Sequence, residues 1–233
     1  MNALQTFNTF LLVLAAIFPV VNPPGSALVF LSLTRRASAD TRGFLAARVA
    51  INAFFVMAGS LLVGTFVLNL YGISVPIIRV AGGIVVAVAG WRLLNEGGQK
   101  EKQEDAAEVD KSDYRGMAFY PLTLPLTTGP GTIAVMISLG FSRTATATVM
   151  GELIFVATIL LAALVIAVSI YVCFAYAARA ERVLGHTGTE IAVRLSAFIL
   201  LCIGVQIFWT GAAELIQMLP HQSTAPVLPK PEG

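Results

Sequence analysis

Long stretches without charged residues are the feature that most limits how this chain can fold. Six mostly apolar runs fill most of the 233 positions, and about 20 apolar residues are enough for a helix to cross a bilayer. With 57% hydrophobic and 12% charged residues, the chain is too apolar for a soluble globular protein. The sequence therefore predicts an all-α membrane protein with spans at Phe7–Leu33, Phe44–Leu70, Ile73–Leu94, Met117–Leu139, Thr148–Ala178 and Gly188–Leu219.

Lys and Arg residues concentrate in the loops on one side of these spans. Because such residues are retained in the cytoplasm, the asymmetry places three basic loops inside and both termini in the periplasm. Segment 95–116 mixes acidic and basic residues without an apolar period, which predicts a solvated cytoplasmic linker. The basic side holds Arg35, Arg36, Arg42, Arg92, Lys100, Lys102, Lys111, Arg115, Arg179 and Arg182, and the other side holds Arg143 and Lys230.

The two halves of the chain resemble each other when the sequence is shifted along itself by 106 positions. This shift aligns Pro19 with Pro125, Pro24 with Pro130, Gly25 with Gly131, Ser26 with Thr132, Ser32 with Ser138 and Leu33 with Leu139. Such self-similarity indicates a duplicated unit, with one copy at 1–94, the other at 117–219 and a periplasmic tail at 220–233. Each copy has three spans, so the second enters the membrane from the opposite side. Inverted repeats of this kind are typical of secondary transporters, whose sites lie where the repeats meet.

Proline and glycine motifs lie in the middle of the first and fourth predicted spans, at 22–26 and 127–132. Proline removes a backbone donor and clashes with the preceding turn, so both spans are expected to break there. The new helix N-termini at Ser26 and Thr132 favour a carboxylate, and the uncharged side chains suit a zwitterionic solute. The alternative is that the prolines only kink two helices for packing. The predicted substrate-binding residues are Asn22, Pro24, Gly25, Ser26, Thr127, Thr128, Gly131 and Thr132.

Two arginines lie a few residues inside the third and sixth predicted spans, Arg79 toward the periplasm and Arg194 toward the cytoplasm. Ionisable groups at such depth are costly and usually have a partner in the protein interior. Either Glu152 or Glu214 could pair with Arg79, while Glu190 lies one turn before Arg194. These five residues are predicted to act as gates or ion pairs. The alternative is that each arginine only extends to the nearer lipid headgroups.

Residues of the common catalytic and cofactor sites are missing from the sequence. There is no GxxxxGK[ST] loop for a nucleotide, and His186 and His221 lie outside the spans without a cluster of metal ligands. The formal charge of +2 reflects the placement of loop residues and does not indicate nucleic-acid binding. We therefore expect no cofactor, no metal, no nucleic-acid partner and no enzymatic activity.

Four strings of residues resemble the MarC family of bacterial and archaeal inner-membrane proteins, also called the NAAT family. The resemblance covers nearly the whole chain except the linker and the tail, and it implies a six-span fold. It also implies a place in a broader group that resembles amino-acid exporters, with alanine and glycine as typical solutes of the members assigned transport. The chain departs from the family pattern at Pro24, where relatives commonly carry other residues. The strings are Asn22–Ser26, Gly72–Pro76 with Arg79–Gly83, Pro121–Ile133, and Glu190–Leu195 with Gly204–Gln206.

The internal repeat, the two proline breaks and the resemblance to the MarC family together predict a transporter in the bacterial inner membrane. This transporter would export or exchange small neutral amino acids. Alternating access would come from rocking one bundle against another around the paired breaks. The alternative is a non-transporting membrane sensor or assembly module whose kinked helices only pack. A wet cavity that reaches both breaks favours transport, and two dry, packed kinks favour the alternative. The prediction includes both directions of flux, with or without a coupling ion, and a homo-oligomer as one form of the protein.

Overall fold

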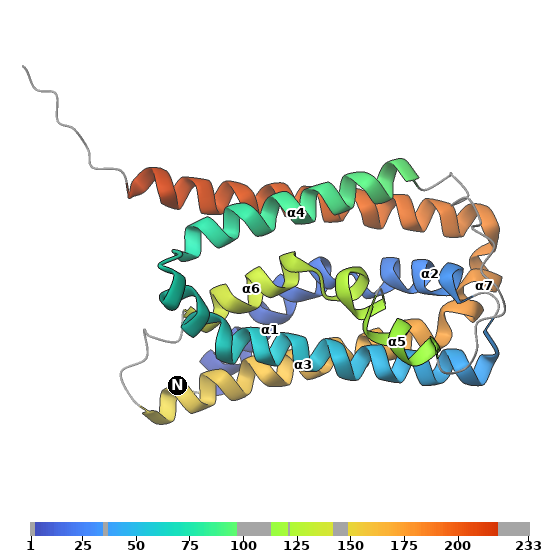
Figure 1. Cartoon of the computed structure of the whole chain (residues 1–233), viewed down its shortest axis with the longest axis horizontal. Coiled ribbons are helices and arrows are strands. Elements are labelled where there is room, and N and C mark those ends of the chain that lie inside the picture. Colours follow the sequence, from blue (N-terminus) through green and yellow to red (C-terminus); the bar gives the residue numbers. More distant parts are fainter. Residues whose placement is uncertain (1–2, 35–36, 97–112, 121, 142–148, 219–233) are drawn as a thin grey trace, which may run out of the picture.

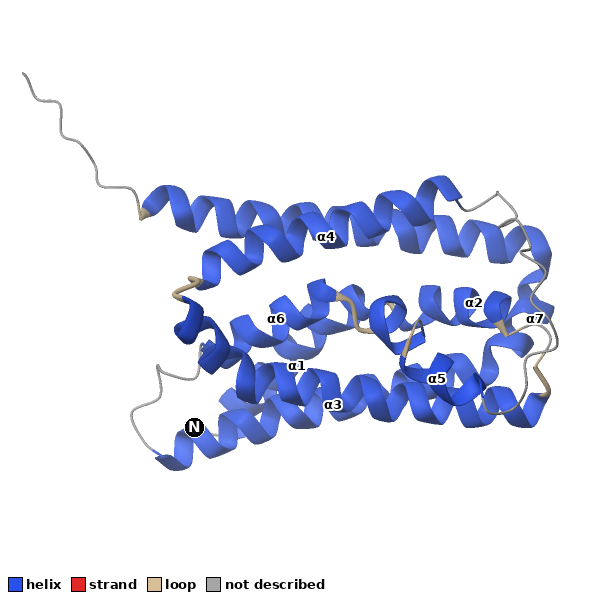
Figure 2. Cartoon of the chain, viewed as in Figure 1, coloured by secondary structure: helices blue, strands red, loops and turns tan. Residues whose placement is uncertain are grey.

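The computed structural model describes residues 3–34, 37–96, 113–120, 122–141 and 149–218, and these residues form helices and short connections without a strand (Figure 2). Five helical segments are long and apolar enough to cross a membrane, and one shorter apolar helix covers Pro130–Phe141. The outward faces of the long segments carry exposed large apolar side chains, as a lipid-facing surface requires. The long segments are Ala3–Leu31, Ala39–Tyr71, Val75–Asn95, Val149–Gly185 and Thr187–Gln217.

The first apolar segment consists of two helices, α1 (Ala3–Val21) and α2 (Pro23–Leu33). Asn22 lies between them in the left-handed conformation, with φ 48° and ψ 60°. Asparagine tolerates this conformation better than most residues, and its side-chain oxygen accepts a hydrogen bond from Gly25 N at 3.2 Å. The two prolines that open α2 need no backbone donors at its first positions. The sequence thus ends one helix and starts the next within a single residue.

Helices α3 (Ala39–Tyr71) and α4 (Val75–Glu96) follow. The side chain of Ser38 caps α3 by accepting a hydrogen bond from Thr41 N at 3.2 Å, and Gly72 ends it with a φ of 65°. Helix α3 therefore starts five residues before the predicted span at Phe44, because the cap lies outside the apolar run. Helix α4 also extends two residues into the predicted linker, most of which lies outside the described residues.

The fourth predicted span is three short helical segments: α5 (Asp113–Phe119), the π-helical turn η1 (Leu122–Thr127) and α6 (Pro130–Phe141). We expected one helix with a single break. Pro125 lacks the N–H that a regular helix needs, and the wider turn of η1 accommodates the loss. Pro130 opens α6, where the first position needs no backbone donor. Leu124 inside η1 has extended backbone angles, with φ −113° and ψ 126°.

Helix α7 (Val149–Gln217) contains the last two apolar segments, which meet at a kink. Gly185 has φ 67° and ψ 176° at this kink, a conformation open to glycine because it has no Cβ. The first segment of α7, residues 149–185, runs seven residues past the predicted end at Ala178. Residues 187–217 form its second segment.

The helices divide into two packed groups, which we name the scaffold and the paired-helix unit. The scaffold comprises α1, α2, α3, α5, η1, α6 and the first segment of α7, and its elements share one large buried apolar cluster. Within the described residues this cluster has no member from α4 or from the second segment of α7. Its centre includes Phe30 of α2 stacked on Phe174 of α7, with ring centroids 4.5 Å apart.

The paired-helix unit comprises α4 and the second segment of α7, which lie along the upper edge of Figure 1. The two helices approach closely through small residues: Gly83 faces the main chain of Gly204 and Phe208, and Gly90 faces that of Leu201. Small residues of this kind let membrane helices pack backbone to backbone. On another face of α4, Gly82 lies against Ala134 of α6, so the unit contacts the scaffold there.

Candidate functional site

The two proline motifs lie next to each other in the scaffold. The hydroxyl oxygen of Ser26 in α2 lies 3.2 Å from the carbonyl oxygen of Val21 and 3.5 Å from that of Leu126 in η1. Gly131, at the start of α6, faces Val20 of α1 and Val86 of α4. The structure thus brings together residues that are about a hundred positions apart in the sequence.

The polar side chains of these motifs mainly satisfy the backbone that the breaks expose. Thr127 and Thr128 are at most 2% exposed, and their hydroxyls donate to the carbonyls of Leu122 and Thr123 at 2.7 and 3.1 Å. Ser26 is also buried and lies against such carbonyls. This is the usual way in which threonine and serine compensate for a missing helical donor inside a membrane.

The other predicted binding residues at the breaks differ in their exposure. Gly25, Gly131 and Thr132 are buried, Asn22 is half-buried as the cap of α2, and Pro24 is exposed. The two pockets described below are lined by other residues. In this conformation the two motifs pack against each other.

Arg79 joins three helices that are far apart in the sequence. Its guanidinium forms an ion pair with Glu214 near the end of α7, and its Nε donates to the hydroxyl of Ser138 in α6 at 3.3 Å. The side chains of Arg79 and Glu214 are 27% and 35% exposed, so the pair is partly withdrawn from the surroundings. Of the two partners considered from the sequence, the structure places Glu214 on Arg79, while Glu152 lies exposed in the first turn of α7.

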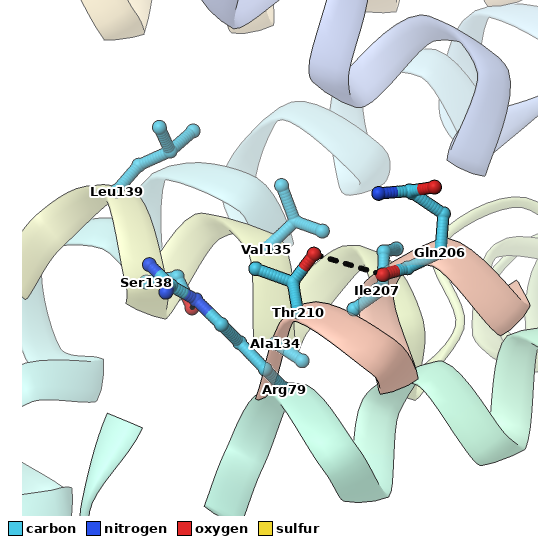
Figure 3. Close-up of a pocket in the computed structure, with 8 residues that line it drawn as sticks. All are labelled: Arg79, Ala134, Val135, Ser138, Leu139, Gln206, Ile207 and Thr210. Carbon is cyan, nitrogen blue, oxygen red and sulfur yellow. Dashed lines mark hydrogen bonds between the residues drawn. The ribbon is translucent and has the colours of Figure 1, made fainter. Parts of the chain in front are cut away.

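A pocket of about 210 Å³, which we name the central pocket, lies between the paired-helix unit and the scaffold. Figure 3 shows the Arg79 side chain reaching from α4 toward Ser138 of α6, with Gln206 and Thr210 of α7 on the other side. The Thr210 hydroxyl donates to the Gln206 carbonyl at 2.9 Å. Polar groups and short apolar walls therefore meet in one concave space, as ligand pockets require. The lining residues are Arg79, Ala134, Val135, Ser138, Leu139, Gln206, Ile207 and Thr210.

A second pocket of about 330 Å³, the end pocket, lies where α3 and α4 connect and where α6 and α7 end. Arg79, Ser138 and Glu214 each lie three or four positions along the chain from a residue that lines this pocket. These lining residues are Pro76, Phe141 and Met218, respectively. The Arg79–Glu214 pair therefore lies between the central pocket and the end pocket. The lining residues are Leu68, Asn69, Gly72, Ile73, Ser74, Val75, Pro76, Phe141 and Met218.

Arg194 and Glu190 form an ion pair of a different kind. Arg194 Nη2 lies 2.8 Å from Glu190 Oε1 within the second segment of α7, and the side chains are 52% and 34% exposed. This i,i+4 pair belongs to one helix and does not connect two elements. Among the described residues, no three His, Cys, Asp or Glu side chains lie close enough to hold a metal ion.

Sequence reasoning missed Ser138, Gln206 and Thr210 as pocket residues. Two sequence features could have drawn attention to these residues. Ser138 aligns with Ser32 in the internal repeat, and Gln206 belongs to a string that resembles the MarC family. Neither signal places the residue beside Arg79, because the contact between Arg79 and Ser138 spans 59 positions and depends on how α4 packs on α6.

Comparisons with known proteins agree with the resemblance seen in the sequence. The family model for "MarC family integral membrane protein" matches residues 7–216. An Archaeoglobus fulgidus protein named "UPF0056 membrane protein" is 31% identical over 198 residues, which cover 85% of this chain and 89% of the relative.

Two bacterial relatives are similar over nearly their whole length. The "UPF0056 inner membrane protein MarC" of Escherichia coli K12 is 31% identical over 218 residues, 92% of this chain and 98% of the relative. The protein of the same name from Citrobacter koseri is 30% identical with the same coverage. No solved structure matches the chain. These names describe membrane proteins rather than enzymes, and they state no solute. The chain belongs to the MarC family of integral membrane proteins.

Proposed function

We propose that this protein is a secondary transporter that exports or exchanges small neutral amino acids by alternating access. The observation that carries the proposal is the position of the central pocket, between the scaffold and the paired-helix unit, with a charged side chain in its wall. A site between two bodies can open to either side of the membrane when one body rocks against the other. A pocket buried inside one rigid body could not do this.

The way in which the two groups are built supports such a motion. The scaffold has a continuous apolar core, whereas the paired-helix unit is held together by the close approach of Gly83 and Gly90 to α7. Its contacts with the scaffold include the small residues Gly82 and Ala134, and small residues permit sliding with little steric cost. Each group would move as a body.

The paired breaks fit this proposal as the joint between two inverted repeats. In each proposed repeat an interrupted segment comes first, then a long scaffold helix, then one helix of the paired-helix unit. We propose that Asn22, Ser26 and Thr132 guide the solute at this joint when the packed conformation opens. A Cβ at Gly25 would overlap the Asn22 side chain, and one at Gly131 would overlap that of Val86, so both glycines would keep the joint compact.

The alternative, a membrane sensor or assembly module, has one observation in its favour. Thr127 and Thr128 are buried and bonded within their own segment, which is what two dry, packed kinks require. A sensor would bind without moving solute across the membrane. Flux therefore separates the two functions.

Counterflow of labelled alanine into proteoliposomes tests the proposed function. We expect saturable uptake that unlabelled alanine or glycine inside the vesicles drives, because exchange needs no energy source. Repeating the assay with a proton gradient and with a sodium gradient identifies a coupling ion. Absence of counterflow for every neutral amino acid, with folded protein in the vesicles, would favour the sensor or assembly module.

The proposed orientation places both termini in the periplasm and the segment between the third and fourth predicted spans in the cytoplasm. A protease site inserted between Glu101 and Lys111 should be cleaved in inverted membrane vesicles and protected in intact spheroplasts. The same site inserted after Lys230 should give the opposite pattern. Cleavage of the first site from the periplasmic face would show that the orientation is reversed.

A further inference from the structure

We infer that Arg79 binds the carboxylate of the solute in the central pocket, and that Glu214 holds the same guanidinium when the pocket is empty. This inference rests on the proposed function and names the binding chemistry of its site. The starting observation is that Arg79 carries the only formal charge among the described residues that line the pocket.

The geometry of Arg79 suits an exchange of carboxylates. A guanidinium has five N–H donors in a planar fork that matches a carboxylate. Glu214 and Ser138 each engage one of its nitrogens, so Arg79 already holds a carboxylate beside the pocket. A solute carboxylate can replace that of Glu214 without leaving the guanidinium unpaired, which would be costly inside a membrane.

Glu214 gives the site its preference for neutral solutes. When the solute carboxylate takes Arg79, the released Glu214 carboxylate lies next to the pocket and can accept the solute ammonium group. A zwitterion then forms two ion pairs, and the site keeps zero net charge. A plain carboxylate leaves Glu214 unpaired, and a plain amine leaves Arg79 competing for Glu214. Binding of a plain carboxylate or of a plain amine is therefore less favourable than binding of the zwitterion, because charges without partners are disfavoured at low dielectric.

The size and walls of the pocket limit the solute to a small one. The volume of about 210 Å³ lies below the roughly 300–1,000 Å³ of pockets for drug-sized ligands. Val135, Leu139 and Ile207 provide apolar walls for a short aliphatic side chain. An amino acid with a small uncharged side chain satisfies these limits.

The partner exchange also connects binding to the proposed motion. Arg79 and Glu214 belong to the paired-helix unit, whereas Ser138 belongs to the scaffold. Breaking the ion pair frees Glu214 at the position between the central pocket and the end pocket. Solute binding would thus break the ion pair that lies between the two pockets.

The test measures binding to the purified full chain in nanodiscs of phosphatidylcholine, so that anionic headgroups do not compete for Arg79. The probes are alanine, propionate and ethylamine, and calorimetry gives each dissociation constant. The variants are Arg79→Gln, Arg79→Lys and Glu214→Gln. Arg48→Gln is the matched control, because Arg48 is exposed on α3 over the ring of Phe44 and lies outside the pocket.

We expect Arg79→Gln to bind alanine between about tenfold and a hundredfold more weakly than the parent, the usual worth of hydrogen bonds to a charged group. Arg79→Lys should lose less, because it keeps the charge without the fork. Glu214→Gln should bind alanine more weakly but propionate more tightly than the parent, because it removes the competing carboxylate. Arg48→Gln should bind all three probes like the parent.

The opposite changes in Glu214→Gln distinguish a binding site from a structural ion pair. If Glu214→Gln binds propionate no better than the parent, or if folded Arg79→Gln binds alanine like the parent, the inference is wrong even when the parent transports alanine. If the parent gives no counterflow but Glu214→Gln binds propionate more tightly and Arg79→Gln does not, the carboxylate site stands and the proposed function fails. The thermal midpoint of each variant establishes that it is folded.

Discussion

Gly204→Ala is expected to lower the free energy of unfolding by about 1–3 kcal/mol, the usual cost of adding a methyl group to a filled helix interface. A Cβ at Gly204 would overlap the main chain of Ala87 in α4. Main-chain atoms cannot rotate away as the end of a side chain can, so the two helices must separate. The loss should appear as a lower thermal midpoint in detergent and as lower abundance in the membrane.

Gly59→Ala is the matched control for this change, because a Cβ at Gly59 of α3 has nothing within 4 Å. Alanine favours a helix more than glycine by about 1 kcal/mol, so this variant should be as stable as the parent or more stable. Equal thermal midpoints for Gly204→Ala and Gly59→Ala would show that α4 and α7 do not pack backbone to backbone.

The sequence predicts five of the six helical segments well, because the length of an apolar run that crosses a bilayer is set by the thickness of the bilayer. The structure also places the small residues Gly83 and Gly90 against α7. The ends of the helices were less predictable. Ser38 starts α3 and Gly185 ends the first segment of α7 outside the apolar runs, and both depend on local backbone geometry.

The fourth predicted span shows where sequence reasoning on proline stops. A proline predicts that a regular helix is interrupted, but it does not predict which structure replaces the helix. Here threonine hydroxyls bond to carbonyls five residues earlier, as Thr127 does to Leu122, and η1 widens accordingly. The hydroxyls of Thr127 and Thr128 therefore bond to backbone carbonyls in this conformation, and their contact with a solute stays a prediction.

The candidate site was only partly predictable for a related reason. Arg79 could be recognised because a charge inside an apolar span needs a partner, and Glu214 was one of two partners considered. The choice between them, and the contribution of Ser138, depend on contacts across 135 and 59 positions. Such contacts follow from the arrangement of whole helices, which local sequence patterns do not specify.

Locking the paired-helix unit to the scaffold is expected to abolish transport completely. Val86→Cys/Gly131→Cys is suited to this, since a Cβ at Gly131 would lie 3.4 Å from the Cβ of Val86, close to the roughly 3.5–4.5 Å that a disulfide spans. Cysteine also lacks the second γ carbon of valine, which would otherwise overlap the new Cβ. Because the bond joins α4 to α6, it should stop any motion between the two bodies.

Alanine counterflow in proteoliposomes that contain this double variant tests the central claim most directly. The measurement is made in a Cys173→Ser/Cys202→Ser background, with each single variant oxidised in parallel as a control. We expect counterflow before oxidation, background uptake once mass spectrometry detects the 86–131 disulfide, and recovery after reduction. Counterflow at the unoxidised rate in fully cross-linked protein would contradict alternating access between the scaffold and the paired-helix unit.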